Sequence, residues 1–185
     1  YRMTVPGGGA VPTAGITFVT VKPTHRRRRV LTTMMRAQLE NIRERGEPAA
    51  ALWASESLIY GRFGFGVAIE GASYTLERPH TTLAVGEATS GRVRLISTDA
   101  ARRVIPDLYA ACTEGIPGTI ARTERDWGLF FADPEHWRDG ASATRFVTFE
   151  RDGEARGYTR YRHKPDWEGG HANHELRVGE LHALD

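Results

Sequence analysis

A strand-like segment that runs through four arginines into a helical pattern most limits what this chain can fold into. Residues 15–21 are rich in β-branched side chains, Pro23 interrupts them, and Arg26–Arg29 lead directly into an apolar helical pattern. The first amide groups of a helix lack partners inside it, and the helix dipole adds about half a positive charge there. Arginine adds charge and forked donors at the same place. The segment therefore predicts a site for an anionic group such as a phosphate.

A helix is predicted from Val30 to Arg45, because apolar residues recur there at helical spacing while charged residues fall elsewhere. Gly46 and then Pro48 are expected to end it. The apolar positions are Val30, Leu31, Met34, Met35, Leu39 and Ile42.

The segments after this helix predict more sheet. Residues 49–54 are apolar on both faces, as expected of a central strand, and Ser55 and Glu56 stand at its end. Residues 58–66 predict a short helix broken by glycines. Strands are predicted over residues 67–70 and 73–77. The order of strand, helix and strand predicts an α/β protein with a mixed sheet.

These motifs, taken in order, resemble the second half of a GCN5-related N-acetyltransferase (GNAT) domain. They are most similar to the Eis-type aminoglycoside N-acetyltransferases of actinobacteria. The similarity runs from Phe18 to Gly66 and rests on the loop VKPTHRRRRVL, the strand end ASES and the element IYGRFGFG. One departure is Arg29, which stands where the family's loop usually carries a glycine that lets the backbone approach the pyrophosphate. The resemblance implies a GNAT fold that uses acetyl-CoA as cosubstrate and no metal.

The resemblance also implies a role for each matching position. Val19, Thr20 and Val21 match the strand whose backbone pairs with the pantetheine arm. Ser55 and Glu56 match the end of the neighbouring strand, which splays to admit the thioester. Tyr60 matches the general acid that protonates the departing thiolate. The residues that match the pyrophosphate loop are Arg27, Arg28, Arg29, Val30, Leu31 and Thr32.

The residues support this chemistry independently. A tyrosine phenol has an ordinary pKa of about 10, so it is protonated at neutral pH and can donate to a thiolate. Acyl transfer to an amine needs an oriented nucleophile and donors aimed at the developing oxyanion. Cys112 lies outside the motif region, so a cysteine nucleophile is not indicated.

The second half of the chain predicts the start of another domain. A strand over residues 93–96 precedes a helix that Thr98 or Asp99 would cap and that runs to about Cys112, with Val104, Leu108 and Ala111 on one stripe. Asp152-Gly153 predicts a hairpin turn between strands at residues 146–150 and 157–162, and residues 174–183 predict a further strand.

By comparison with the family, this order begins a second, catalytically degenerate GNAT domain. The predicted organisation is therefore the back of a catalytic domain over residues 1–79, a linker over 80–91, and the front of the second domain over 92–185. The chain is accordingly expected to be an internal piece. The family's general base, the C-terminal carboxylate of the full polypeptide, would then lie outside it.

Composition argues against several classes of protein, including disulfide-linked and membrane-spanning ones. The 25 basic and 23 acidic residues nearly balance, and 40% apolar content is sufficient for a core. A single cysteine excludes an internal disulfide and suits a reducing cytosol. No apolar run approaches a membrane span. The expected location is cytoplasmic, with secretion or delivery into a host cell left open.

The predicted function is transfer of acetyl from acetyl-CoA to primary amines of cationic small molecules such as aminoglycosides, or of protein lysines. The resemblance also implies a homo-oligomer, a hexamer. Two alternatives stay open: a nucleic-acid-binding module that uses Arg26–Arg29, and a non-catalytic scaffold. For single residues, Tyr60 as a packing aromatic and Ser55 as a helix cap stay open too. The histidines near residues 163–182 suggest metal spacing, but solvated loop histidines are the commoner case, and no metal is predicted.

Overall fold

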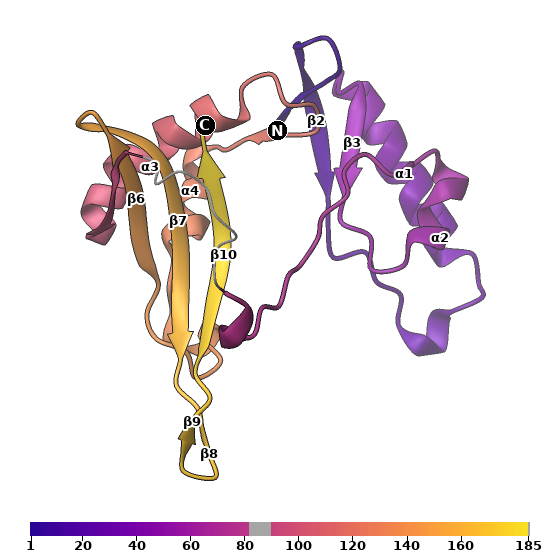
Figure 1. Ribbon diagram of the computed structural model, residues 1–185. Helices are drawn as coiled ribbons and strands as arrows, with labels where there is room; N and C mark the ends of the chain where they lie inside the picture. The colour runs from indigo at the N-terminus through magenta and orange to yellow at the C-terminus, as the bar shows by residue number, and fades with distance from the viewer. Residues whose placement is uncertain (82–89, 185) are drawn as a thin grey trace. The chain divides into compact units, whose positions relative to one another are not determined.

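The computed structural model describes residues 1–81 and 90–184 (Figure 1). Contacts divide the chain into two compact units. One consists of Tyr1–Thr75 with Gly115–Ala121, and the other of Leu76–Glu114 with Arg122–Asp185. Residues 82–89, the centre of the predicted linker, lie outside the described residues. The domain boundaries therefore stay a prediction.

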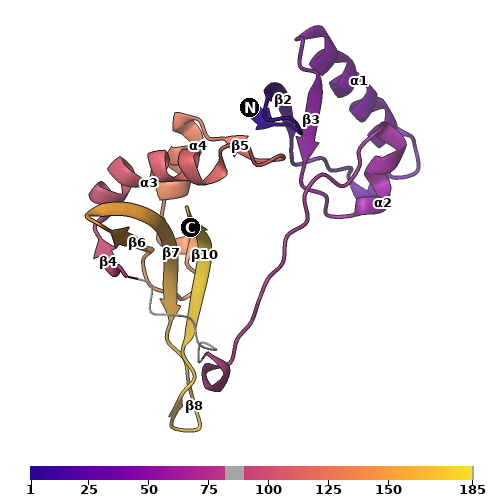
Figure 2. The same cartoon turned by 45° about the horizontal axis from the view of Figure 1, so that its top comes forward.

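The first unit is a βαβ arrangement extended by short strands. Its sheet has the order β3-β2-β1-β5, in which β2 and β3 are parallel and the other pairs are antiparallel. The crossover between the parallel strands is α1, which lies beside β2 and β3 in both views (Figures 1 and 2). The elements are β1 (Arg2–Thr4), β2 (Ala10–Ile16), η1 (Pro23–His25), α1 (Val30–Glu44), β3 (Ala49–Leu52), α2 (Ser57–Tyr60), η2 (Gly61–Phe63) and β5 (Ile120–Ala121).

The helix α1 confirms the predicted apolar face. Met35 and Ile42 are buried against Ala14 and Ile16 of β2, and Leu31 and Leu39 pack at the edge of this cluster. The helix ends as predicted, because Gly46 adopts a φ of 73° and donates its amide to the Arg43 carbonyl. A left-handed glycine of this kind satisfies carbonyls that the helix leaves open.

The second unit is a four-stranded antiparallel sheet with two helices on one face. The strand order is β10-β7-β6-β4. Asp152 and Gly153, with φ values of 52° and 82°, form the hairpin turn between β6 and β7, as predicted. The elements are η3 (Arg78–His80), β4 (Arg92–Ile96), α3 (Thr98–Thr113), α4 (Glu124–Phe131), η4 (Glu135–Trp137), β6 (Arg145–Arg151), β7 (Glu154–Lys164), β8 (Trp167–Glu168), β9 (His171–Ala172) and β10 (Glu175–Ala183).

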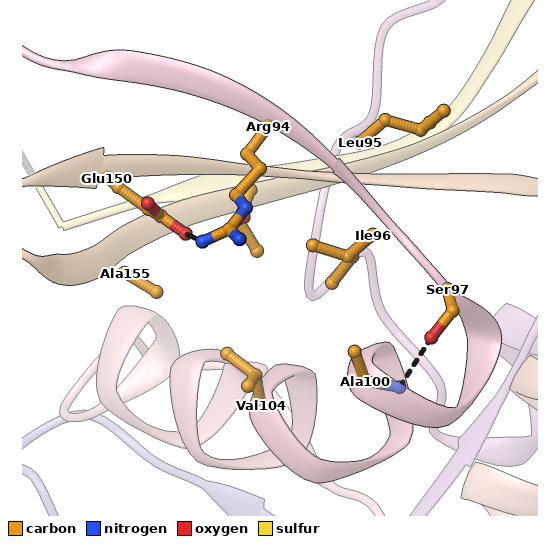
Figure 3. Close-up of a pocket in the computed structure, with 9 residues that line it drawn as sticks. Arg94, Leu95, Ile96, Ser97, Ala100, Val104, Glu150 and Ala155 are labelled. Carbon is orange, nitrogen blue, oxygen red and sulfur yellow. Dashed lines mark hydrogen bonds and ion pairs between the residues drawn. The ribbon is translucent and has the colours of Figure 1, made fainter.

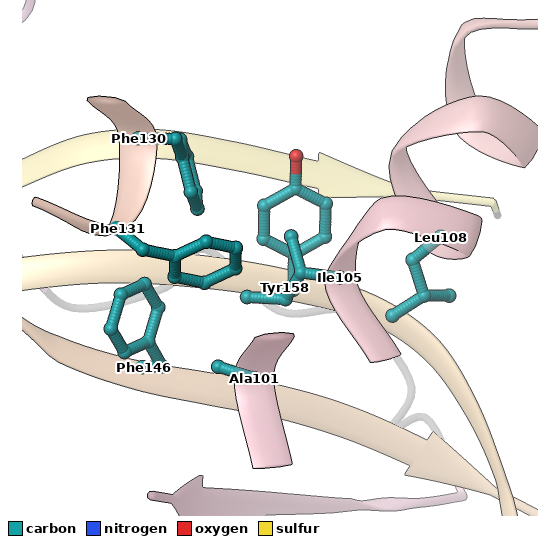
Figure 4. Close-up of a cluster of buried hydrophobic side chains, with 7 residues drawn as sticks. All are labelled: Ala101, Ile105, Leu108, Phe130, Phe131, Phe146 and Tyr158. Carbon is teal, nitrogen blue, oxygen red and sulfur yellow. The ribbon is translucent and has the colours of Figure 1, made fainter. Parts of the chain in front are cut away.

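The core of the second unit lies between its helices and its sheet. Phe130 and Phe131 of α4 meet edge to face and stack beside Phe146 of β6 (Figure 4). Each such side chain contributes about 1.5–3 kcal/mol by leaving water. The buried residues are Ala101, Ile105, Leu108, Phe130, Phe131, Phe146 and Tyr158.

Several predicted elements are wrong in detail. The strand predicted over residues 15–21 ends at Ile16, because β3 pairs with β2 only as far as Leu52. The strands predicted over 67–70 and 73–77 are absent, since no described segment pairs with them. A strand needs a partner for its amide and carbonyl groups, whatever its side-chain pattern.

Two local expectations for α3 also change. Its cap is Ser97, whose hydroxyl accepts from the Ala100 amide at 3.2 Å, instead of Thr98 or Asp99. Its buried stripe is centred on Ile105, and Ala111 is exposed.

The hairpin of β1 and β2 was not predicted, although Pro6-Gly7-Gly8 is a strong turn signal. Gly7 and Gly8 both adopt positive φ there.

Candidate functional site

The first unit opens where its two parallel strands stop pairing. Ile16 is the last residue of β2 opposite β3, and its partner is Leu52. Beyond this pair the two segments continue without strand pairing, and Phe18 and Trp53 are 93% and 94% exposed. Phe18 also has a φ of 55°, which turns the chain away from the strand direction. The end of the paired region thus leaves free backbone on both sides.

Val19, Thr20 and Val21 lie in this unpaired segment, so the prediction that they form part of a strand is wrong. Val19 packs against the core of the first unit, Val21 is half-buried, and Thr20 is exposed. Among the described residues no strand uses their amide and carbonyl groups. This leaves the groups available to pair with an extended ligand.

The arginine loop enters α1 through two left-handed residues. Arg27 and Arg29 each have a φ of 60°, and Arg29 is the N-cap of the helix without a capping side chain. Its carbonyl accepts from the amide and hydroxyl of Thr33 at 3.0 and 3.3 Å. This backbone conformation costs an ordinary residue about 1–2 kcal/mol and costs glycine almost nothing. The expected family glycine at Arg29 therefore matches a real backbone requirement.

The amide groups of residues 29–32, at the start of α1, have no acceptor within the described residues. The first turn of α1 carries no acidic side chain, and Arg26–Arg29 are all exposed. Unpaired amides, a helix dipole and several guanidinium groups therefore converge on one loop. The arrangement fits a phosphate or pyrophosphate.

Tyr60 stands at the end of α2, half-buried against the same core. Its ring meets the ring of Phe65 edge to face with centroids 6.1 Å apart, and its carbonyl accepts from the Phe65 amide at 3.4 Å. In the part of the chain that the structure describes, no group hydrogen-bonds its hydroxyl. The ring is thus held by packing while the phenol stays available as a donor.

The structure brings together part of the predicted site. Val19, Leu31 and Tyr60 all pack against the cluster formed by β2 and α1. Ser55 and Glu56 are exposed at the open end of β3, and Glu56, not Ser55, takes the N-cap position of α2 without a capping bond. The interpretation of Ser55 as a cap is therefore wrong. The functional roles of these residues stay predictions.

Cys112 gives no sign of a nucleophile. The thiol is half-buried on α3, and burial raises its pKa above the usual value. A raised pKa lowers the fraction of reactive thiolate.

The second unit contains a buried polar cluster that was not predicted from the sequence. Arg122 binds Glu180 through two nitrogens, and the hydroxyl of Tyr158 donates to the same carboxylate. Burial alone would raise the pKa of Glu180, but hydrogen bonds from Arg122 and Tyr158 outweigh it and leave that pKa lowered. Burial first, and then the bond to Glu180, raise the pKa of Tyr158. The members are 22 to 58 residues apart in sequence, so no local pattern indicated them.

A pocket of about 380 Å³ lies between α3 and the strands β4 and β6 (Figure 3). Ile96, Ala100 and Val104 form its apolar wall. Arg94 pairs with Glu150 at 3.3 Å on the strand side. Thr148 also lines it, 2% exposed, with a hydroxyl that has no described partner. The lining is suited to a mainly apolar group.

The histidines of the second unit lie among other contacts. His174 accepts from the Asp166 amide at 3.1 Å, and its ring meets those of His163 and Trp167. Among residues 1–81 and 90–184, no three His, Cys, Asp or Glu side chains converge as a metal site requires. In the same residues no helix combines the length and apolar content needed to cross a membrane.

Comparison with known protein families gives two matches. One family model, described as "Acetyltransferase (GNAT) domain", matches residues 1–68, and a second of the same description matches residues 118–185. The matched segments contain the arginine loop and the β6-β7-β10 sheet respectively.

The sequence is similar to parts of longer proteins. It is 46% identical, over its whole length, to an uncharacterized N-acetyltransferase of Streptomyces avermitilis, of which it covers 46%. It is 35% identical over 83% of its length to the N-acetyltransferase Eis of Mycobacterium tuberculosis, of which it covers 39%. The chain spans about half the length of the curated relatives it matches.

Solved structures of N-acetyltransferases and related proteins resemble the whole chain. The crystal structure of Eis1 from Mycobacterium abscessus matches the whole chain and 45% of its own with a TM-score of 0.73 at 31% identity. A conserved protein of Enterococcus faecalis matches with a TM-score of 0.76 at 19% identity, which shows a shared fold.

Proposed function

The chain belongs to the GNAT family, among its Eis-type N-acetyltransferases, and on that basis we propose that it forms part of an enzyme that acetylates primary amines with acetyl-CoA. The observation that carries this proposal is the loop at the start of α1. Its amides from 29 to 32 have no described acceptor, and arginines flank them. This donor set fits the pyrophosphate of coenzyme A.

The geometry suggests a role for each of these residues. Arg27 and Arg28 hold the pyrophosphate together with the amides of Arg29, Val30, Leu31 and Thr32. The free backbone of Val19–Val21 pairs with the pantetheine arm, and Ser55 and Glu56 border the gap between the strand ends. When bound, acetyl-CoA supplies an activated acetyl thioester. The unpaired strand ends leave room for it beyond Ile16 and Leu52.

Tyr60 is the proposed proton donor. Its phenol Oη gives its proton to the leaving sulfur. The edge-to-face contact with Phe65 orients the ring, so that the proton is delivered from a defined position.

The proposed acceptors are primary amines of cationic small molecules, with aminoglycosides as the first class to test and protein lysines as the second. The support is the similarity to proteins named Eis. We propose a homohexameric assembly on the family resemblance, and a cytoplasmic location because a single cysteine suits a reducing compartment.

The test is acetyl-CoA turnover by the full-length polypeptide, followed as release of free thiol with a panel of amines. We expect turnover that depends on the amine and is absent without it. Binding to oligonucleotides that falls steeply with salt, with no turnover on any amine, would favour the nucleic-acid alternative instead. If the polypeptide shows no turnover and does not bind coenzyme A, the result would favour a non-catalytic scaffold.

A further inference from the structure

A pocket lined by arginines lies in the second unit, among residues that the proposed function does not use. It has a volume of about 180 Å³. Four guanidinium groups line it, from Arg138, Arg160, Arg162 and Arg177. The side chains of Arg138 and Arg162 are mostly buried, with 29% and 25% exposure. Several cations are thus gathered in a partly desolvated space.

Strand register brings these arginines together. Arg160 and Arg162 are two residues apart on β7, so they share one face of the sheet. Arg177 of β10 lies directly opposite Arg162. Like charges in such a cross-strand pair repel each other and destabilise the sheet unless anions compensate them.

Carboxylates compensate only part of this charge. Asp133 pairs with Arg162 at 2.6 Å and with Arg138 at 3.2 Å. Arg177 pairs with Glu175 at 2.9 Å and with Asp139 at 3.1 Å. Asp139 also pairs with Lys164 at 3.0 Å, so its charge is shared. The lining as a whole therefore stays positive.

Arg160 is the guanidinium without a carboxylate partner among the described residues. Its Nη1 donates to the Phe130 carbonyl at 2.9 Å, and the group lies 4.3 Å from the centre of the Phe130 ring. Burial lowers the pKa of Arg160; the charge of Glu180 opposes this, and Arg122 and Arg162 add to it. Among the described residues, the Nε of Arg138 is buried without an acceptor. A buried donor of this kind indicates a missing acceptor.

The backbone keeps Arg160 open toward the pocket. The pairing of β10 with β7 shifts between Val178 and Glu180, which leaves Gly179 at a bulge. A Cβ at Gly179 would stand 3.4 Å from the Nε of Arg160. Larger side chains at this position would therefore cover the free donor edge.

We propose that this pocket binds the phosphoryl group of a small molecule. A phosphate carries up to two negative charges and several acceptor oxygens, so it can serve Arg160 and Arg138 at once. A carboxylate supplies less charge than a phosphate to this lining, which itself contains four arginines and no Asp or Glu. The ring of Trp137, 51% exposed, also lines the pocket and offers a face to the rest of such a molecule.

The test is calorimetric titration of the purified protein with inorganic phosphate. The starting variant carries Arg27→Ala and Arg28→Ala, so that the loop at α1 contributes less to phosphate binding. We expect binding to persist there, to weaken roughly ten-fold or more on adding Arg160→Met, and to recover partly with Arg160→Lys. Arg145→Met, an exposed arginine on β6, is the matched control and should change nothing.

Two results would overturn the proposal: loss of all phosphate binding in the Arg27→Ala, Arg28→Ala protein, or unchanged binding in a folded Arg160→Met protein. Acetate that binds while phosphate does not would overturn the assignment to a phosphoryl group. Circular dichroism checks folding. If Arg160→Met does not fold, Arg177→Gln, at a half-exposed position, replaces it in the test. We expect this variant to weaken phosphate binding by a smaller factor. Unchanged binding would again contradict the proposal.

Discussion

Ile16 and Leu52 form the last backbone pair between the parallel strands β2 and β3. Beyond them no described strand pairs with either segment, and the loop at the start of α1 presents amides that have no acceptor among the described residues. An extended ligand with an anionic end suits both features, and five predictions follow from them and from the second unit.

Replacing Arg27 and Arg28 by alanine in the full-length protein should weaken coenzyme A binding by about 2–4 kcal/mol. Each charged contact contributes about 1.5–3 kcal/mol and neighbours are not fully additive. Isothermal calorimetry measures this. Arg36→Ala, on an exposed position of α1, is the control. An affinity equal to that of the control would remove the loop from the cofactor site.

Arg29→Gly should raise the free energy of unfolding by up to about 1 kcal/mol, because the left-handed backbone at Arg29 strains any residue with a Cβ. Coenzyme A affinity should stay the same or improve. Urea unfolding and calorimetry measure the two effects. Arg29→Ala separates backbone from side chain: a similar loss of affinity in both variants would show that the guanidinium has its own contact.

Tyr60→Phe should lower kcat of the full-length enzyme by about 100-fold or more and leave coenzyme A affinity unchanged, because only the proton donor is lost. Steady-state kinetics with a responsive amine measure this. Tyr74→Phe removes the hydroxyl of an exposed tyrosine and should behave as the wild type. A raised KM with unchanged kcat would reassign Tyr60 to packing.

Glu180→Gln should lower the free energy of unfolding at pH 7 by about 2–3 kcal/mol. The expected loss of stability is smaller than for breaking a fully buried ion pair, because the Glu180 side chain keeps 15% exposure. The folded-state pKa of Glu180 is lowered, so its contribution is complete above the unfolded value of about 4.3 and is lost as pH falls through the folded pKa.

Urea unfolding between pH 7 and pH 3 measures this, and the variant should lose less stability than the wild type over the acidic part. Glu168→Gln, on an exposed strand, is the control. A variant with the stability and acid dependence of the control would show that the cluster around Glu180 contributes little.

The 185-residue chain alone should associate through the face of the second sheet opposite α3 and α4. By strand register, Leu95 of β4 and Leu181 of β10 lie on the same face, and they are 56% and 69% exposed. Exposed apolar side chains on one face of a sheet favour association. Replacing both by lysine should shift sedimentation profiles toward monomer. Replacing exposed Leu58 of α2 by lysine should not, and equal profiles for both variants would argue against this face.

Local signals determined much of the first unit. The helical period from Val30 to Ile42 and the glycine at 46 predicted α1, because helix faces and ends depend on residues only a few positions apart. The turn at Asp152-Gly153 was equally local. The arginine loop was located from sequence for the same reason, since a helix start and its flanking charges are neighbours in the chain.

Tertiary structure decided what depends on distant partners. The end of β2 at Ile16 depends on where β3 stops, and residues 67–77 form no strand because no described segment pairs with them. The arginine pocket depends on the register that sets Arg177 opposite Arg162. Sequence by itself therefore determined α1 with its end, the β6-β7 turn and the position of the arginine loop, for which phosphate binding stays a prediction. Pairing of backbone groups across long separations decided where strands end and which charges meet, because those groups gain hydrogen bonds only when a partner is present.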